Sequence, residues 1–166
     1  MYLKKMIVPS LCVFTLIAIS VGCKKSNTIS NSSTISATMG SSNMSISGAN
    51  ESTWYSTDSS VFEMGGLYVN GKDTTVLAIQ LVPPFTIGTP VTDWRSVSID
   101  YYNYSTTADY YAGDGLGHFS LTVSSQDTVN HRIVGTFSGT LYNGISGTDS
   151  MVVTNGKFNT AYSVVP

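Results

Sequence analysis

Aromatic residues concentrate in one short stretch of this chain, and its side chains are the best suited to ligand binding. Six rings fall within residues 94–111, with carboxylates and amides interleaved among them. Such rings stack on sugars or anchor a partner protein, while polar neighbours supply hydrogen bonds. The candidate ligand-binding residues are Trp94, Asp100, Tyr102, Tyr104, Tyr110 and Tyr111.

A strand through this stretch would divide its side chains between two faces. If Ile99 points inward, the pleat turns Asp100, Tyr102 and Tyr104 outward. The alternative is that the rings cover the edge of a sheet and pack on loops, because tyrosine is a favoured strand residue. The exposure of Tyr102 and Tyr104 distinguishes the two interpretations.

Residues for catalysis or metal binding are sparse elsewhere. The two histidines, His118 and His131, lie at expected strand starts and have no second ligand at a metal-binding spacing. No serine occupies a Gly-x-Ser-x-Gly elbow. Asp114 lies in a glycine-rich stretch that lacks the repeated carboxylates of a calcium loop, so we expect a plain turn there. The sequence predicts no enzyme, no metal site and no cofactor.

The first 22 residues predict an export signal. Lys4 and Lys5 precede an apolar run at residues 6–19, which is shorter than the roughly 20 residues that span a bilayer. The pair Gly22-Cys23 resembles a bacterial lipobox, although Ser20 stands where leucine is usual. We predict cleavage before Cys23 and its lipidation, which would join the mature chain to a membrane through an N-terminal lipid anchor. An ordinary cleaved signal is the alternative.

Residues 23–36 predict a flexible tether, and residues 37–166 predict one folded domain. The first range is almost entirely Ser, Asn, Thr and Lys, which bury too little apolar surface to become ordered. The second range is long enough for a single core. Two of the eight Lys and Arg residues precede Cys23, which leaves six against ten Asp and Glu. This acidic balance argues against a nucleic-acid partner.

Alternating apolar and polar residues predict an all-β domain. The pattern is clearest at residues 133–141, and it recurs at 44–48, 61–69, 76–82, 96–104 and 119–123. Pro83-Pro84 should end a strand, because proline has no N–H to donate. Asn70-Gly71 and Asn155-Gly156 suit the positive φ angles of two-residue hairpin turns. We predict a single antiparallel β-sandwich or a partly closed β-barrel.

A family resemblance rests on the signal sequence, Trp54-Tyr55, the spaced tyrosines, and the segments GTFSGTL and VTNGKFN. Together they resemble a family of small uncharacterised lipoproteins of Bacteroidetes, defined as a domain of unknown function. The resemblance covers roughly residues 37–162 and implies an all-β envelope protein. It carries no catalytic residues.

Three triplets match the Bacteroidetes O-glycosylation pattern of Asp, then Ser or Thr, then a small or apolar residue. Their acceptors are Thr74, Thr128 and Ser150, each at a predicted turn or strand start. The pattern also arises by chance, since Ser and Thr are abundant here.

The leading hypothesis for function is a lipoprotein of the cell envelope whose domain is a non-enzymatic binding module for a protein partner or a glycan. We expect the outer membrane, facing the periplasm, because Lys24-Lys25 contains no acidic run of the kind linked to surface export. The alternative is a structural or assembly role without a small-molecule ligand. An enzyme is the third hypothesis.

Overall fold

A computed structural model describes residues 33–113, 115–144 and 147–166 of the chain. The predicted signal peptide, Cys23, most of the predicted tether and Asp114 lie outside these residues. Within the described part, no helix combines the length and apolar character that crossing a membrane requires.

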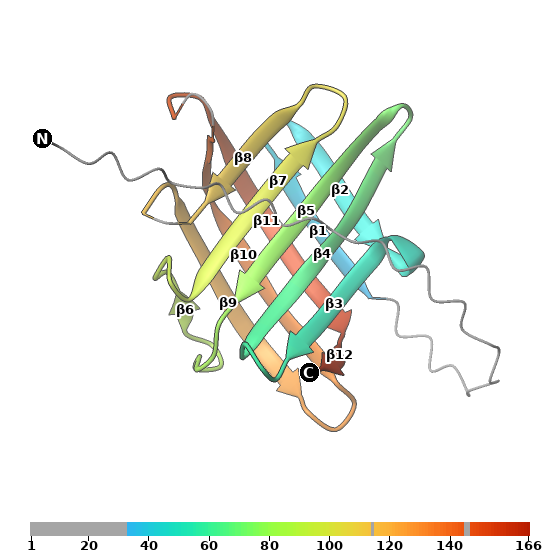
Figure 1. Ribbon diagram of the computed structural model, residues 1–166, viewed down its shortest axis with the longest axis vertical. Helices are drawn as coiled ribbons and strands as arrows, with labels where there is room; N and C mark the ends of the chain where they lie inside the picture. Colours follow the sequence, from blue (N-terminus) through green and yellow to red (C-terminus); the bar gives the residue numbers. More distant parts are fainter. Residues whose placement is uncertain (1–32, 114, 145–146) are drawn as a thin grey trace, which may run out of the picture.

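The domain is built from β-strands, with one turn of 3-10 helix at Gly48–Asn50 (Figure 1). The strands are β1 (Thr34–Met39), β2 (Ser42–Ser47), β3 (Glu51–Ser56), β4 (Val61–Asn70), β5 (Asp73–Leu81), β6 (Pro90–Val91), β7 (Val97–Asn103), β8 (Ala108–Ala112), β9 (His118–Asp127), β10 (Arg132–Asn143), β11 (Ser150–Ala161) and β12 (Ser163–Val165).

These strands form one sheet that folds back on itself without closing. Its order is β12-β3-β4-β5-β7-β8-β10-β11-β1-β2, and the short β12 pairs with β3 in parallel. Strands β3, β4, β5 and β7 form the near layer in Figure 1, and β1, β10 and β11 cross behind them. The predicted all-β fold is confirmed, and the two layers belong to a single sheet rather than to two separate ones.

One strand has two partners along the same edge. Residues 132–140 of β10 pair with β9, whereas Tyr142 and Asn143 pair with β8. Strands β8 and β9 therefore part from each other. The two-residue β6 pairs with the free edge of β9 at Pro90 and Val91.

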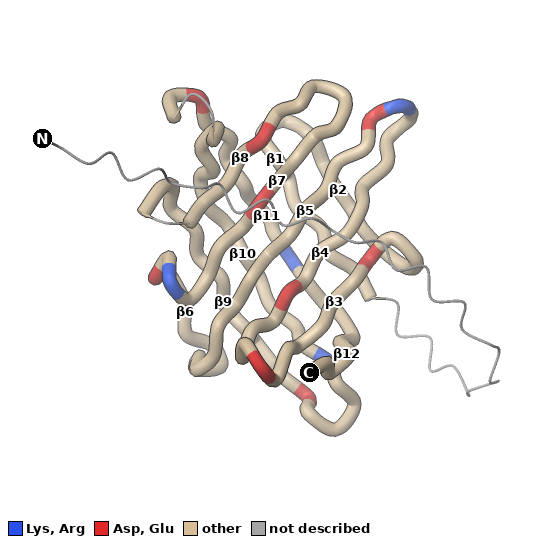
Figure 2. The backbone as a smooth tube through the Cα atoms, in the orientation of Figure 1, with Lys and Arg blue, Asp and Glu red and all other residues tan. Residues whose placement is uncertain are grey.

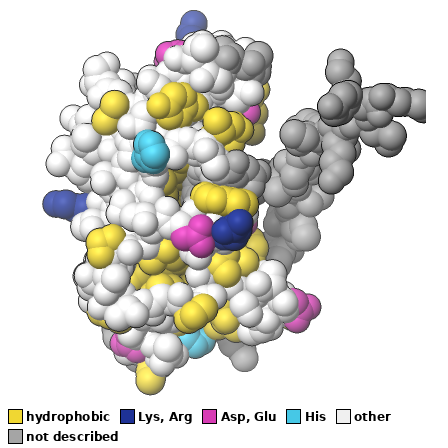
Figure 3. Space-filling view, turned by 90° about the vertical axis from the view of Figure 1, so that its left-hand side faces the viewer, with side chains coloured by type: hydrophobic (Ala, Val, Ile, Leu, Met, Phe, Trp, Pro, Cys, Tyr) yellow, Lys and Arg dark blue, Asp and Glu magenta, His cyan; other side chains and the backbone are white. Residues whose placement is uncertain are grey.

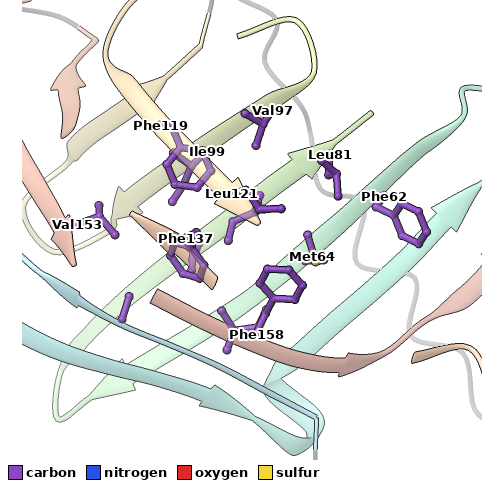
Figure 4. Packing of buried hydrophobic residues seen from close by; sticks show 14 of the residues in the cluster. Phe62, Met64, Leu81, Val97, Ile99, Phe119, Leu121, Phe137, Val153 and Phe158 are labelled. Atoms are coloured by element: carbon purple, nitrogen blue, oxygen red, sulfur yellow. The ribbon is translucent and has the colours of Figure 1, made fainter. Parts of the chain in front are cut away.

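The core follows the predicted alternation. Leu77, Ile79 and Leu81 of β5 are fully buried, as are Ile133 and Leu141 of β10, and Phe137 is 3% exposed. Figure 4 shows Leu81 and Phe137 among the side chains of this core. Each such side chain is separated from the next inward one by an outward residue, because successive strand side chains point to opposite faces. Pro83-Pro84 follows β5 after one residue, Val82, and its peptide bond is cis.

Three inward glycines are each covered by a phenylalanine of the neighbouring strand. Gly135 lies opposite Phe158, and Gly156 lies opposite Phe137. A Cβ built on Gly135 would be 2.3 Å from Cζ of Phe158, and one on Gly156 would be 2.5 Å from Cδ2 of Phe137. Gly139 stands in the same relation to Phe119 across β9 and β10. These glycines leave room for rings that fill the space between the layers.

The structure corrects the predicted turn at Asn155-Gly156. Both residues lie inside the continuous strand β11, and the β10–β11 connection lies between Asn143 and Ser150. The register of β11 gains one residue against both β10 and β1 next to Asn155, whose φ is 54°. The pair therefore forms a β-bulge, a feature that needs a residue tolerant of positive φ just as a turn does.

The other predicted hairpin is confirmed. Its two-residue turn is Gly71-Lys72, one residue later than the predicted pair, because Asn70 still pairs with Asp73 as the last residue of β4. Gly71 has φ of 64°, whereas Asn70 does not have a positive φ.

The start of the domain needs a correction. Strand β1 begins at Thr34, and Ile35 is fully buried, so the last three residues of the range predicted as a tether belong to the sheet.

A buried hydroxyl gives a test of this core. Thr160 is fully buried opposite Ile133, and among the described residues its Oγ1 has no hydrogen-bond partner. Thr160→Val should keep or raise the free energy of unfolding, by up to about 1 kcal/mol, because the methyl group replaces an unpaired polar atom of similar size. Chemical denaturation measures the effect, with Thr136→Val on an exposed site of β10 as the control. A loss of more than about 1 kcal/mol would show that the hydroxyl is paired.

Candidate functional site

The structure divides the predicted aromatic cluster among three places. Trp94 lies in the turn that precedes β7, whereas Tyr102 lies near the other end of that strand, about 17 Å beyond Val97 at the rise of an extended chain. Tyr110 of β8 turns inward, where its ring lies 6.3 Å from that of Tyr101. Its hydroxyl donates a hydrogen bond of 2.5 Å to Oδ2 of Asp149, which raises the pKa of Tyr110. Trp94 and Tyr110 thus lie apart from the outward tyrosines.

Tyr102 and Tyr104 point outward, as predicted from Ile99. Ile99 is fully buried, Tyr102 is half-buried, and Tyr104 is 58% exposed. The two rings meet edge to face, with centroids 4.9 Å apart and an angle of 86° between planes. Each ring thereby limits the freedom of the other, which prepares both for contact with a ligand.

Aliphatic side chains extend this aromatic pair across two more strands. In register, Leu67 of β4 lies opposite Val76 of β5, and Val76 lies opposite Tyr102 of β7. Val69 lies two residues beyond Leu67 on the same face, and it is 55% exposed. Tyr104 continues that row, because its N–H donates to the carbonyl of Thr74, the residue paired with Val69. We call these residues the outer patch: Leu67, Val69, Val76, Tyr102 and Tyr104.

The outer patch has few charges around it. Figure 2 shows charged residues sparsely placed along β4, β5 and β7, the strands that carry the patch. Asp109 of β8 lies opposite Tyr102, and burial raises the pKa of its carboxyl. Asp100 is exposed one row further along β7, opposite Tyr111. Among the predicted polar residues, Asp100 therefore lies at the border of the patch.

The aliphatic members of the patch were not expected as site residues. Leu67 and Val69 belong to the apolar run at residues 61–69, where alternation from the buried Phe62 and Met64 would place odd positions outward. This alternation could have predicted that Leu67 and Val69 are exposed. Their position beside the tyrosines depends on the pairing of β4, β5 and β7, which the local sequence pattern does not predict.

A second feature lies where β8 and β9 part. A cavity of about 480 Å³ opens there, and Trp94 lines it. Figure 3 shows hydrophobic side chains gathered around hollows on this side of the molecule. We call the cavity the gap pocket; besides four glycines and a threonine, it is lined by Trp94, Val97, Ala112, Leu116, Phe119, His118, Ser120 and Ser138.

The histidines lie apart from each other. His118 begins β9 at the gap pocket, whereas His131 lies in the β9–β10 turn with φ of 49°. The imidazole of His131 stacks on Tyr162, with centroids 5.3 Å apart. Within residues 33–113, 115–144 and 147–166, no three His, Cys, Asp or Glu side chains gather into a metal site.

The predicted glycosylation acceptors occupy different environments. Thr128 is exposed in the β9–β10 turn, and Ser150 is exposed at the start of β11. Thr74 is half-buried as the second residue of β5. Hydrogen bonds from Asn130 hold the pKa of Asp127, beside Thr128, below its ordinary value.

The outer patch and the gap pocket thus each combine exposed rings with a defined shape. No family model, curated protein or solved structure matches the chain.

Proposed function

We propose that this chain is a cell-envelope lipoprotein whose β-domain is a non-enzymatic module that binds another protein through the outer patch. The anchor is lipidated Cys23, on the membrane side of the tether, in the outer membrane and facing the periplasm. Support for the anchor comes from the signal sequence and its Gly22-Cys23 junction. Support for binding comes from the outer patch.

The observation that carries the binding proposal is the arrangement of five apolar side chains in two adjacent rows on one sheet face. Leu67, Val69 and Tyr104 are all exposed, the last two by more than half. A folded domain leaves single apolar residues on its surface without consequence, but a contiguous patch marks an interaction surface. Tyrosine rings flanked by aliphatic side chains and bordered by carboxylates are typical of the centre of a protein interface.

A protein fits the patch better than a glycan does. Leu67, Val69 and Val76 offer neither a flat ring for stacking nor a hydrogen-bonding group. They suit the side chains of a protein partner, whose burial drives association in proportion to apolar area. A purely structural role for these rings would require the same chain to cover them, and Tyr104 is 58% exposed.

The variant Tyr102→Ala with Tyr104→Ala tests this function. We expect its affinity for the partner to fall by tenfold or more, since each anchoring ring contributes roughly 1 kcal/mol or more. Its melting temperature should change little, because both rings point outward. The measurement is quantitative co-purification from cross-linked cell envelopes, followed by identification of the captured proteins.

The matched control removes two exposed apolar side chains elsewhere, by Val129→Ala with Val152→Ala; these are 87% and 52% exposed. The control should capture the same proteins as the wild type. Equal loss in both variants would contradict a specific patch. If the wild type captured carbohydrate and no protein, the tyrosines would bind a glycan and the proposed protein partner would be wrong.

A further inference from the structure

The gap pocket has a shape that the fold itself imposes. Strand β10 pairs with β9 along residues 132–140 and with β8 at Tyr142 and Asn143, so the two partner strands must diverge. Strand β6 and the segment after it, which includes Thr92 and Trp94, border the opening between β9 and β7. The cavity of about 480 Å³ falls in the range of small-molecule sites.

Buried residues close the floor of the pocket. Val97, Ala112 and Phe119 are at most 7% exposed and belong to the core cluster. The rim is a tight turn in which Gly113 and Leu116 exchange backbone hydrogen bonds of 2.9 and 2.8 Å. Gly117 completes the turn at φ of 74°, where a Cβ would be 2.7 Å from the carbonyl oxygen of Thr140. The core thus closes the pocket on its inner side, and the rim turn is too crowded at Gly117 for a side chain.

Trp94 is held in place at the mouth of the pocket. Its turn is fixed by Asp93, whose carbonyl accepts hydrogen bonds from the N–H groups of Ser96 at 2.8 Å and Val97 at 3.0 Å. The guanidinium of Arg95 lies 4.5 Å from the centroid of the indole ring. Arg95 itself is not among the described residues that line the pocket. The indole is 43% exposed and forms a supported aromatic platform.

Uncharged polar groups complete the lining. His118, Ser120 and Ser138 come from β9 and β10, where Ser120 lies directly opposite Ser138. Within the part of the chain that the structure describes, their side chains make no hydrogen bond, so their donors and acceptors remain available. No Asp, Glu, Lys or Arg is among the described lining residues. The described lining thus pairs one indole ring with two serine hydroxyls and an imidazole.

We infer that the gap pocket binds one neutral sugar ring, as a site separate from the outer patch. The C–H face of a sugar stacks on an indole, and its hydroxyls exchange hydrogen bonds with serine hydroxyls and an imidazole. The volume of the cavity has room for a single ring. A charged ligand would find no counter-charge among the described lining residues.

Trp94 fluorescence tests the inference in the full-length lipidated protein, held in detergent micelles. The chain has two tryptophans, so Trp54→Phe leaves Trp94 as the sole tryptophan, which is excited selectively at wavelengths that the tyrosines do not absorb. The probes are the methyl glycosides of glucose, galactose, mannose and N-acetylglucosamine, with sodium octanoate as the apolar comparison. At least one glycoside should change the emission saturably, with a Kd on the order of 1 mM for a ligand of about a dozen heavy atoms.

Variants assign the binding to this pocket. Ser120→Ala with Ser138→Ala should weaken it about tenfold or more, since each lost hydrogen bond weakens binding several-fold. Ser124→Ala, further along β9 and outside the pocket, should leave it unchanged. Absence of saturation by all four glycosides, saturation by octanoate instead, or equal affinity in the serine variants would overturn the inference. The Tyr102 and Tyr104 variant should bind the glycoside normally, so failure of the outer patch and failure of the pocket are distinguishable.

Discussion

Gly156→Val should lower the free energy of unfolding by about 3 kcal/mol or more, at the upper end of the range for overpacked cores. A Cβ at this position would be 2.3 Å from the carbonyl oxygen of Phe137 and 2.6 Å from Cγ of its ring. The ring cannot retreat freely, because Phe137 is 3% exposed in the core. Strand β10 must therefore move away from β11, the strand with which it shares its longest run of pairs.

Chemical denaturation and thermal melting measure the effect, and Lys157→Val is the matched control. Lys157 is the next residue of β11 and is exposed, so a β-branched side chain there should change stability by less than about 0.5 kcal/mol. If Asn155-Gly156 formed a hairpin turn instead, a positive φ at Gly156 alone would make Gly156→Val lower the free energy of unfolding by about 1 to 3 kcal/mol. An unchanged melting temperature for Gly156→Val would show that the Phe137 ring does not lie over Gly156.

Cys23→Ala should abolish the lipid anchor altogether. The predicted lipid anchor carries two or three acyl chains on this cysteine, which makes attachment effectively permanent, and nothing can be acylated once the thiol is removed. The variant should be released in soluble form or accumulate as an uncleaved precursor. Cell fractionation and mass spectrometry of the mature N-terminus distinguish these outcomes.

Cys12→Ala is the control, because Cys12 lies within the predicted signal and leaves with it. That variant should be processed and anchored like the wild type. Normal processing and unchanged membrane association of Cys23→Ala would end the lipoprotein proposal.

The strands could be predicted because each carries its own period of two. Ile133, Phe137 and Leu141 alternate with polar residues, and the structure buries all three. The bulge at Asn155 could not be predicted, because Asn-Gly suits positive φ equally in a turn and in a bulge. The choice depends on pairing with β1 and β10, which a local signal does not contain.

The candidate site divides in the same way. The alternation of residues within one strand was enough to predict that Tyr102 and Tyr104 point outward. Their contact with a surface that includes Leu67 and Val76 requires the register of three strands. The gap pocket is harder to predict from the sequence than the outer patch. It exists only where β10 changes partner from β9 to β8.

Site-specific photo-cross-linking in living cells tests the binding proposal most directly. A photoreactive phenylalanine analogue in place of Tyr104 would report what lies against the outer patch, and the same analogue in place of Val129 would report an exposed position elsewhere. We predict a discrete cross-linked protein from position 104 that is absent from position 129. Identical products from both positions, or no protein product from position 104, would contradict the outer patch as a protein-binding surface.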